Sequence, residues 1–314
     1  MVLLWKQALV VLTLLLVPVS TVAKRKKNDS ADNSNSQDPA DDPHRFLPPG
    51  PNDKRSPCPA INVLANHGYI ARDGVSIDID DLAAALSMVF PVSDDFPYQP
   101  LGGAQAAGLM DAGDATKLTL DRLFEPKKQE HDASLTRVDS YFGVDKAMHV
   151  DMGLMDQLLR SDGKSFLDQH NLKEYQAARV RESLHHNPEA SFSDDDIQAM
   201  AQQMTRVLAF GQDPAYRFVE KYIVEAILQD ERLPDGYMLY DRFEPVSFRP
   251  GTKSAAVRDM FMANIRQAID TDDDDEEDMC AGTTGMAARL CKSRPGVYQM
   301  MYKRMGQNLS LIHI

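Results

Sequence analysis

A cysteine held between two prolines constrains the fold near the start of the chain more than any other short element does. Pro57 and Pro59 have fixed φ angles, so Cys58 is carried by a stiff segment. Pro59 is suited to the first position of a helix, and residues 60–67 are predicted to continue that helix up to Gly68. Cys58 is therefore expected at a helix N-terminus, where free N–H groups and the helix dipole favour a thiolate.

The cysteine count indicates that Cys58 has no disulfide partner. The chain has three cysteines, and two of them, Cys280 and Cys291, are close enough in sequence to form a local disulfide. Cys58 would then be left for intermolecular pairing, a reactive thiol or a ligand role. The same residues, taken alone, also fit a buried free thiol or a mispaired cysteine.

The N-terminus is typical of a secretory signal. Lys6 precedes a long apolar run, and small residues lead up to Ala23. The run is shorter than the roughly 18–20 residues that span a membrane, so we expect a signal peptide at 1–23, no membrane anchor and a secreted protein. Residues 24–51 are rich in Lys, Asp, Asn, Ser and Pro, which predicts a disordered leader.

Composition favours one globular domain, which we place at 52–308. Of the 314 residues, 43% are hydrophobic and 26% are charged. The net charge of −13 disfavours nucleic acid and anionic membrane as partners, since both select basic surfaces. The last residues, 309–314, match a sequencing adapter read in frame and are expected to be non-native, with a genuine apolar tail as the alternative. Nothing in the sequence indicates an oligomeric state.

Most periodic segments are helical, which predicts a mainly α fold class: one all-helical domain with very little β structure. Asp78 is the expected N-cap of a helix that Pro91 ends. Ser193 and Asp196 form a predicted capping box at the start of another helix. Further helices are expected over 104–113, 173–186 and 216–233, and the best strand candidate is 74–79. The acidic run 272–278 lacks the ligand spacing of a calcium loop and is expected to be a solvated loop.

A second cluster of polar residues follows in the middle of the chain. Glu130, Asp132 and Ser134 place three oxygen side chains within five residues, which suits a hard cation such as Mg²⁺. His131 lies among them and could act as an acid–base group. Taken alone, such a cluster also fits an exposed turn.

Two of these elements together resemble a known family. The run Pro-Cys-Pro-Ala-Ile-Asn-Val-Leu-Ala-Asn-His-Gly-Tyr around Cys58, with Glu-His-Asp-Ala-Ser about seventy residues later, resembles the secreted haem-thiolate peroxidases, the chloroperoxidase and unspecific peroxygenase family. The Glu-Arg-Leu-Pro segment that ends at Pro234 is similar as well, so the resemblance extends from about His44 to Pro234. It implies an all-helical fold around haem b, with Cys58 as the proximal iron ligand.

The resemblance also implies a metal site and a reaction. Glu130, Asp132 and Ser134, with backbone oxygens of His131 and Ala133, would bind Mg²⁺ beside a haem propionate. Hydrogen peroxide would be the oxidant and a small organic molecule the substrate.

The chain departs from the family at the distal acid. The family uses a glutamate to move the peroxide proton, and its shorter members pair that glutamate with the histidine that corresponds to His131. Here the expected position falls on Gln202 or Gln203, and a glutamine amide cannot accept and return a proton. Four explanations stay open: compromised catalysis, a substitute acid among residues 194–196, His131 acting alone, or a shifted alignment.

Two functions therefore follow from the resemblance. The first is a secreted haem-thiolate peroxidase or peroxygenase that uses H₂O₂ on small organic substrates. The alternative is an exported haem-binding protein on the same scaffold, with activity impaired at Gln202 or Gln203. A non-haem helical protein would leave the Pro-Cys-Pro element unexplained.

Overall fold

A computed structural model describes residues 42–125, 131–160, 163–237 and 245–280, without the side chains of 272–280. The chain divides into Met1–Asp38 and Pro39–Ile314, and every described residue belongs to the second unit. The expected signal peptide, Glu130, Cys291 and the tail 309–314 lie outside the described residues.

The described chain is mainly helical, which confirms the predicted fold class. The α-helices are α1 Pro59–Asn66, α2 Ile79–Val89, α3 Tyr98–Ala106, α4 Val144–Ala147, α5 Met152–Leu159, α6 Gln169–His186, α7 Asp194–Phe210, α8 Lys221–Val224 and α9 Lys253–Cys280. Short 3-10 turns are η2 Leu120–Phe124 and η3 Ser140–Phe142, and η5 Glu225–Gln229 is a π-helical turn. Within the described part of the chain, no helix is both long and apolar enough to cross a membrane.

The β structure consists of two small antiparallel pairs. Strand β1, Ile77–Asp78, pairs with β2, Lys117–Leu118. Strand β3, Phe166–Asp168, pairs with β4, Phe218–Glu220, in the register Leu167 to Val219. The expected strand at 74–79 thus forms over its second half.

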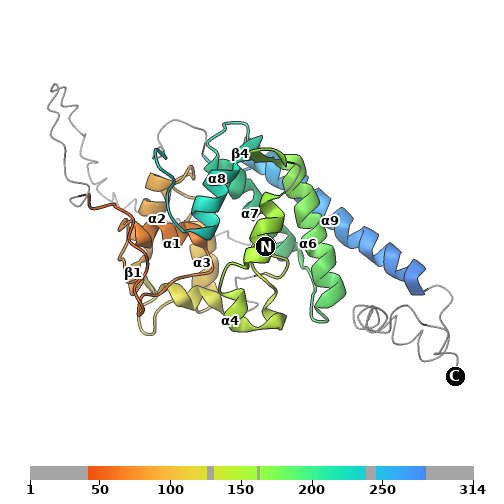
Figure 1. Cartoon of the computed structure of the whole chain (residues 1–314). Helices are drawn as coiled ribbons and strands as arrows, with labels where there is room; N and C mark the ends of the chain where they lie inside the picture. Colours follow the sequence, from red (N-terminus) through yellow and green to blue (C-terminus); the bar gives the residue numbers. More distant parts are fainter. Residues whose placement is uncertain (1–41, 126–130, 161–162, 238–244, 281–314) are drawn as a thin grey trace, which may run out of the picture. The chain divides into compact units, whose positions relative to one another are not determined.

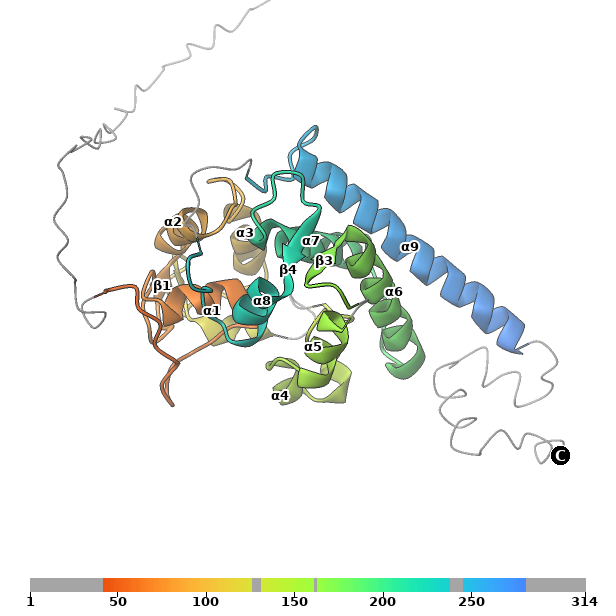
Figure 2. The ribbon, with the colours of Figure 1, turned by 45° about the horizontal axis from the view of Figure 1, so that its top comes forward.

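Helices α6 and α7 both pack against the long helix α9 (Figures 1 and 2). Fully buried residues on α7 and α9, among them Met200, Met204, Phe261 and Ile265, belong to the hydrophobic core. Helix α1 packs instead against α2 and η5. The core therefore holds the helix that carries Cys58 and the helix that carries the two candidate glutamines in one folded body.

Local signals placed several helix ends correctly. The Asp78 carboxylate accepts a hydrogen bond from the Asp80 N–H at 2.9 Å, and α2 ends at Val89, before Pro91. Ser193 and Asp196 form the predicted capping box of α7, each side chain bonded to the other residue's backbone N–H. These predictions are confirmed, because caps and prolines act within one turn of the chain.

Three expectations about secondary structure were wrong. The helix expected at 104–113 lies earlier, at Tyr98–Ala106, and ends before Gly108, whose φ is +74°. The helix expected at 216–233 begins as strand β4, because Phe218–Glu220 pairs with a distant segment. The acidic run 272–278 continues α9 rather than forming a loop. A helix already held by packing on α6 and α7 needs no new nucleus to extend.

Candidate functional site

Cys58 lies at the N-terminus of α1, as predicted. It is the N-cap residue, with φ −88° and ψ 107°, and Pro59 takes the first helical position. The thiol is half-buried, and Cys58 is a free cysteine. Its backbone N–H donates to Ser56 Oγ at 3.1 Å, which fixes the turn before the helix. A thiol in this position faces the positive end of the helix dipole.

Asn62, one turn into α1, holds the Ser56 turn that precedes the helix through hydrogen bonds to its backbone. Its Oδ1 accepts from the Ser56 N–H and its Nδ2 donates to the Ser56 carbonyl, both at 2.8 Å. The same Nδ2 donates to Glu231 Oε1 at 2.6 Å. Glu231 follows the π-helical turn η5 and has a positive φ of 51°. Burial raises the pKa of the Glu231 carboxyl.

Asn66 and Arg55 extend this network at the other end of α1. Asn66 Oδ1 accepts from Arg55 Nε at 3.0 Å and from Arg55 Nη2 at 2.7 Å, and Asn66 Nδ2 donates to the Glu231 carbonyl at 3.0 Å. The two asparagines, four residues apart, therefore tie one face of α1 to the segment after η5.

His67 joins three segments at the C-terminal end of α1. Its Nε2 accepts from the Leu233 N–H at 3.0 Å, so the proton of the neutral ring must sit on Nδ1. Nδ1 donates to the His44 carbonyl at 2.7 Å, and the His44 ring stacks on Tyr69 with centroids 4.0 Å apart. Leu47 N–H adds a bond to the Asn66 carbonyl at 2.9 Å. Part of the segment expected as leader is thus bound to α1.

Burial lowers the pKa of His67, with a further contribution from the nearby Arg72 guanidinium. The sequence showed Asn62, Asn66 and His67 only as part of a resembling motif, without roles. The structure assigns them the positioning of α1 and of the turn that carries Cys58.

Helix α7 carries the other half of the candidate site. Arg206 lies one turn after Gln202 and Gln203, on the same side of α7, because residues three and four apart share a helix face. Arg206 is within electrostatic reach of Cys58. The two candidate glutamines therefore share a side of α7 with an arginine that interacts electrostatically with Cys58.

Arg206 is enclosed by protein yet keeps part of its side chain accessible. Burial lowers the pKa of its guanidinium, while the Cys58 thiolate raises it. The guanidinium lies 5.9 Å from the centroid of the Phe96 ring. One turn earlier, Gln203 Oε1 is buried and has no hydrogen-bond partner among the described residues. Such an oxygen is unusual, because buried polar groups are nearly always paired.

The aspartates considered as substitute acids lie at the start of α7. Asp196 is engaged in the capping box with Ser193, and Asp194 is 84% exposed and pairs with Arg266 at 2.8 Å. Seven residues of helix separate Asp196 from Gln203, which is about 10 Å along the axis. Asp196 lies on the same side of α7 as Gln203 but two turns earlier, and its carboxylate is engaged at the start of the helix rather than beside Gln203.

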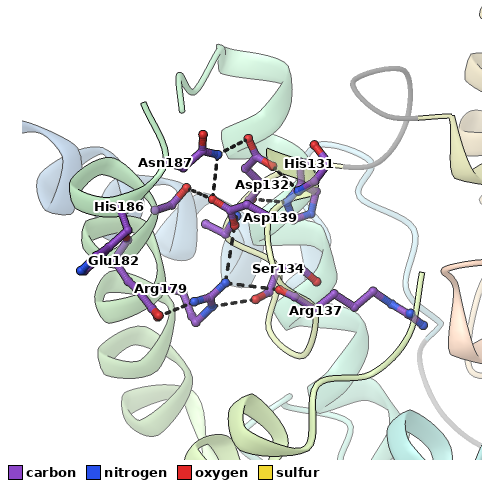
Figure 3. A network of polar contacts seen from close by, with 12 residues as sticks. His131, Asp132, Ser134, Arg137, Asp139, Arg179, Glu182, His186 and Asn187 are labelled. Atoms are coloured by element: carbon purple, nitrogen blue, oxygen red, sulfur yellow. Dashed lines mark hydrogen bonds and ion pairs between the residues drawn. The ribbon is translucent and has the colours of Figure 1, made fainter. Parts of the chain in front are cut away.

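The second motif, 131–134, forms a loop held by α6 and by the segment that follows it (Figure 3). Asp132 accepts from the Ser140 N–H at 3.3 Å and from Asn187 Nδ2 at 3.0 Å, through different oxygens. Ala133 has a φ of +57°, and its carbonyl accepts from Gln176 Nε2 at 2.9 Å. The loop is therefore fixed by hydrogen bonds to its backbone and to Asp132.

A buried ion pair lies beneath the loop. Asp139 and Arg179 have side chains that are 2% and 5% exposed, with Arg179 Nη2 3.6 Å from Asp139 Oδ1. Asp139 also accepts from the Ala133 N–H at 2.9 Å and from Asn187 Nδ2 at 3.0 Å. Figure 3 shows these side chains converging from the loop and from α6. The ion pair thus supports the motif, and sequence reasoning did not find it because its members are 40 residues apart.

His131 has a defined ring state in this loop. Its Nδ1 lies 2.8 Å from the Asp132 carbonyl, which only accepts, so Nδ1 carries the proton of the neutral ring. Nε2 is then unprotonated and able to accept a proton. No hydrogen bond connects His131 to Gln202 or Gln203 among the described residues.

The described donors do not make up a magnesium site by themselves. Both Asp132 oxygens and the Ala133 carbonyl are turned to N–H donors, and Glu130 lies outside the described residues. No group of three or more His, Cys, Asp or Glu residues suited to a metal ion occurs in the part of the chain that the structure describes.

Comparison with known proteins identifies the family. Residues 44–242 match the profile of peroxidase family 2, which is more than half of the chain. The chain therefore belongs to this family, and the resemblance to haem-thiolate peroxidases read from its motifs is confirmed.

Three relatives illustrate the likeness. The chain is 38% identical to the chloroperoxidase of Leptoxyphium fumago over 103 residues, covering 32% of this chain and 27% of that protein. It is 31% identical to the dothistromin biosynthesis peroxidase dotB of Dothistroma septosporum over 161 residues, 46% of this chain and 38% of that protein. It is 29% identical to the aromatic peroxygenase of Cyclocybe aegerita over 180 residues, 52% of this chain and 48% of that protein. In each case the match spans less than half the length of the relative.

The residues around Cys58 fit a haem group bound through sulfur. The thiol is free and is presented at a helix N-terminus, where a thiolate is favoured. On α7, and among the described residues, the buried Gln203 Oε1 has no hydrogen-bond partner and the Arg206 guanidinium has no carboxylate partner. An internal site prepared for a ligand shows this combination.

Proposed function

We propose that the chain binds haem b through the Cys58 thiolate and acts as a haem-thiolate peroxidase or peroxygenase that uses H₂O₂ on small organic substrates. The observation that carries the proposal is the free Cys58 at the N-terminus of α1, close enough to Arg206 on α7 to interact with it electrostatically. Haem ligated by a thiolate would supply the redox chemistry, because sulfur donates electron density that favours cleavage of the peroxide O–O bond.

The protein's part on the sulfur side is to hold the ligand charged and oriented. The N–H groups at the start of α1 and the helix dipole present a positive field to the Cys58 sulfur. Asn62 fixes the Ser56 backbone on both its N–H and its carbonyl, so the turn has little freedom. Such positioning of a metal ligand by its surroundings tunes both affinity and reactivity.

The protein's part on the other side is to move a proton. His131 Nε2 is the group we assign to accept the peroxide proton and to return it, since Nδ1 is committed to the Asp132 carbonyl. Gln202 and Gln203 would orient peroxide by hydrogen bonds, without changing their own charge.

The first test is a spectrum of the reduced CO complex of the haem-loaded chain. We expect the red-shifted Soret band of thiolate ligation. Cys58→Ala should abolish it, and Cys58→His, which keeps an iron ligand but no sulfur, should give an unshifted band. An unshifted band in the parent chain would refute the assignment of Cys58.

The second test concerns His131. A positioned acid–base group contributes about 10²- to 10⁴-fold, so His131→Gln should slow peroxide-dependent turnover by at least about 100-fold. The exposed His170→Gln is the matched control and should leave turnover unchanged. Equal rates for the parent chain and the His131→Gln variant would exclude His131 as the proton carrier.

An alternative function is haem binding with impaired turnover. It is favoured by one observation: the buried Gln203 Oε1 stands where a titratable group is expected, and an amide relays no proton at ordinary pH. A thiolate spectrum without peroxide turnover, restored by Gln202→Glu or Gln203→Glu, would establish this alternative.

Two finer expectations belong to the same proposal. Magnesium would be held by Glu130, Asp132 and Ser134, with backbone oxygens of His131 and Ala133, and metal analysis of the purified chain tests it. Export from the cell would follow from the signal at 1–23, and N-terminal sequencing of the protein from culture medium should find a start near Lys24.

A further inference from the structure

A half-buried cation, Arg206, has no counter-ion among the residues that the structure describes. Among the described residues, Arg206 has no hydrogen bond or ion pair with a carboxylate; its contacts are the Phe96 ring and the field of Cys58. A guanidinium largely surrounded by protein has less water around it than one on the surface, so a counter-ion stabilises it more. Such a charge persists where a ligand supplies the missing partner.

The neighbours of Arg206 on α7 leave the charge uncompensated. Gln202 and Gln203 lie four and three residues before it, the two positions from which a glutamate would form an ion pair along the helix. Both are neutral amides. The substitution that removes the expected distal acid therefore also leaves the positive charge of Arg206 available to another group.

The nearest negative group does not fill this role in the working protein. In the proposed function the Cys58 thiolate is the iron ligand, so its charge is shared with the metal. Part of the Arg206 side chain stays accessible, which leaves room for contact with a bound molecule.

We propose that Arg206 binds a carboxylate group at this site, contributed either by the substrate or by a haem propionate. The proposal rests on the proposed function and names the chemistry that the site selects. A guanidinium holds a carboxylate through two parallel N–H donors, a geometry that lysine does not reproduce. Gln203, one turn away, offers its unpartnered amide oxygen to a donor on the same ligand. Phe96 gives the guanidinium an apolar ring beside the carboxylate.

The test compares Arg206→Gln with Arg206→Lys in the haem-loaded chain, by calorimetric titration with benzoate and with methyl benzoate. If the substrate supplies the carboxylate, Arg206→Gln weakens benzoate binding about 10- to 100-fold and leaves the ester unchanged. The benzoate affinity of Arg206→Lys should lie between those of the parent chain and Arg206→Gln, since lysine keeps the charge and loses the paired donors. Far-UV circular dichroism checks that each variant is folded.

A second experiment tests whether the carboxylate comes from a haem propionate instead of the substrate. The haem-free chain is titrated with protohaem and with its dimethyl ester, followed by Soret absorbance. If a propionate supplies the carboxylate, Arg206→Gln weakens the binding of protohaem. Binding of the dimethyl ester and of benzoate is then unaffected. Folded Arg206→Gln protein that behaves like the parent chain in both arms would overturn the proposal.

Failure of the proposed function is distinguished by a different measurement: the CO spectrum would lack the thiolate band. In that case benzoate calorimetry on the haem-free chain still reports on Arg206. Weaker binding in Arg206→Gln supports a carboxylate site, and equal binding overturns it.

Discussion

Two arginines on neighbouring helices, one buried and one half-buried, differ in the partners of their guanidinium groups. Arg179 on α6 donates to the carbonyls of Ser134 and Arg137 at 3.0 and 3.3 Å and pairs with Asp139 and Glu182. Arg206 on α7 has none of these partners among the described residues. Both helices pack against α9, so the two side chains belong to the same folded body.

This difference in partners distinguishes an arginine that stabilises the fold, Arg179, from one that is available to a ligand, Arg206. The donors of Arg179 are used within the chain, and they hold the loop 131–139 in place without any ligand. Within the described part of the chain, Arg206 makes no hydrogen bond through its guanidinium, and the acceptor Gln203 Oε1 one turn away has no partner. A fold can keep such groups only where their cost is offset by a function or by a bound molecule. The turn that carries Cys58 is held by hydrogen bonds, as the loop 131–139 is, and Cys58 interacts electrostatically with Arg206.

The largest predicted effect follows from removing the satisfied arginine. Arg179→Gln should lower the free energy of unfolding by about 3 to 5 kcal/mol, because Asp139 is left as a buried carboxylate without its cation. Denaturant unfolding followed by circular dichroism measures it. Arg206→Gln is the matched control and should change stability by less than about 1 kcal/mol, or raise it. Equal losses in the two variants would mean that Arg206 is as well compensated as Arg179.

The next effect concerns the brace of Cys58. Asn62→Leu should cost about 2 to 3 kcal/mol, because the Ser56 N–H and carbonyl and the Glu231 carboxyl all lose their buried partner. The haem-loaded variant should also show a weaker thiolate band in the CO spectrum, since the turn is freed. Gln105→Ala removes an exposed amide with one bond and serves as the control. A loss no larger than the control's would show that the brace is dispensable.

A pH effect follows from His67. Its folded pKa lies below its unfolded value of about 6.5, so the folded chain binds fewer protons. The stability it contributes is present above that value and is lost as the pH falls through the folded pKa. Protonation would break the bond from the Leu233 N–H and would place a second cation near Arg72. The other facing groups are His44 and Asp42, and the latter favours the charged ring.

Unfolding measured from pH 7.5 down to pH 5 should therefore show a loss of stability that shrinks in His67→Gln. The exposed His170→Gln should keep the full pH dependence. An unchanged profile in His67→Gln would assign the acid sensitivity to other groups.

Much of this fold was predictable from short-range signals, and the errors came from long-range ones. Asp78, Pro91 and the Ser193 capping box act within a few residues, so their helix ends were predicted correctly. The pairing of β3 with β4 joins segments about fifty residues apart, and nothing local distinguishes Phe218–Glu220 from the helix that follows. The extension of α9 through its acidic run likewise depends on packing elsewhere on that helix.

The site divides in the same way. Pro57 and Pro59 were enough to place Cys58 at a helix N-terminus, because they act on the adjacent backbone. Arg206 gave no signal, since an arginine at helical spacing is usually exposed and its relation to Cys58 arises only when α1 and α7 fold together. The roles of Asn62 and His67 depend on Glu231 and Leu233, more than 160 residues away, and were equally hidden.

The smallest predicted effect comes from a variant that gives Arg206 a carboxylate partner, as Arg179 already has. Gln203→Glu places a carboxylate three residues before Arg206 on the same face of α7, where such pairs add about 0.2 to 0.5 kcal/mol in exposed helices. The gain should vanish when Arg206→Gln is added, and the double-mutant cycle isolates the pair. Gln198→Glu on the exposed side of α7 controls for the added charge. Burial of the new carboxylate opposes the gain. If the free energy of unfolding falls by more than about 1 kcal/mol and the loss persists in the double variant, the two side chains do not meet. A gain confined to the parent Arg206 background, together with weaker benzoate binding, would show that the carboxylate from Glu and the ligand compete for the same guanidinium.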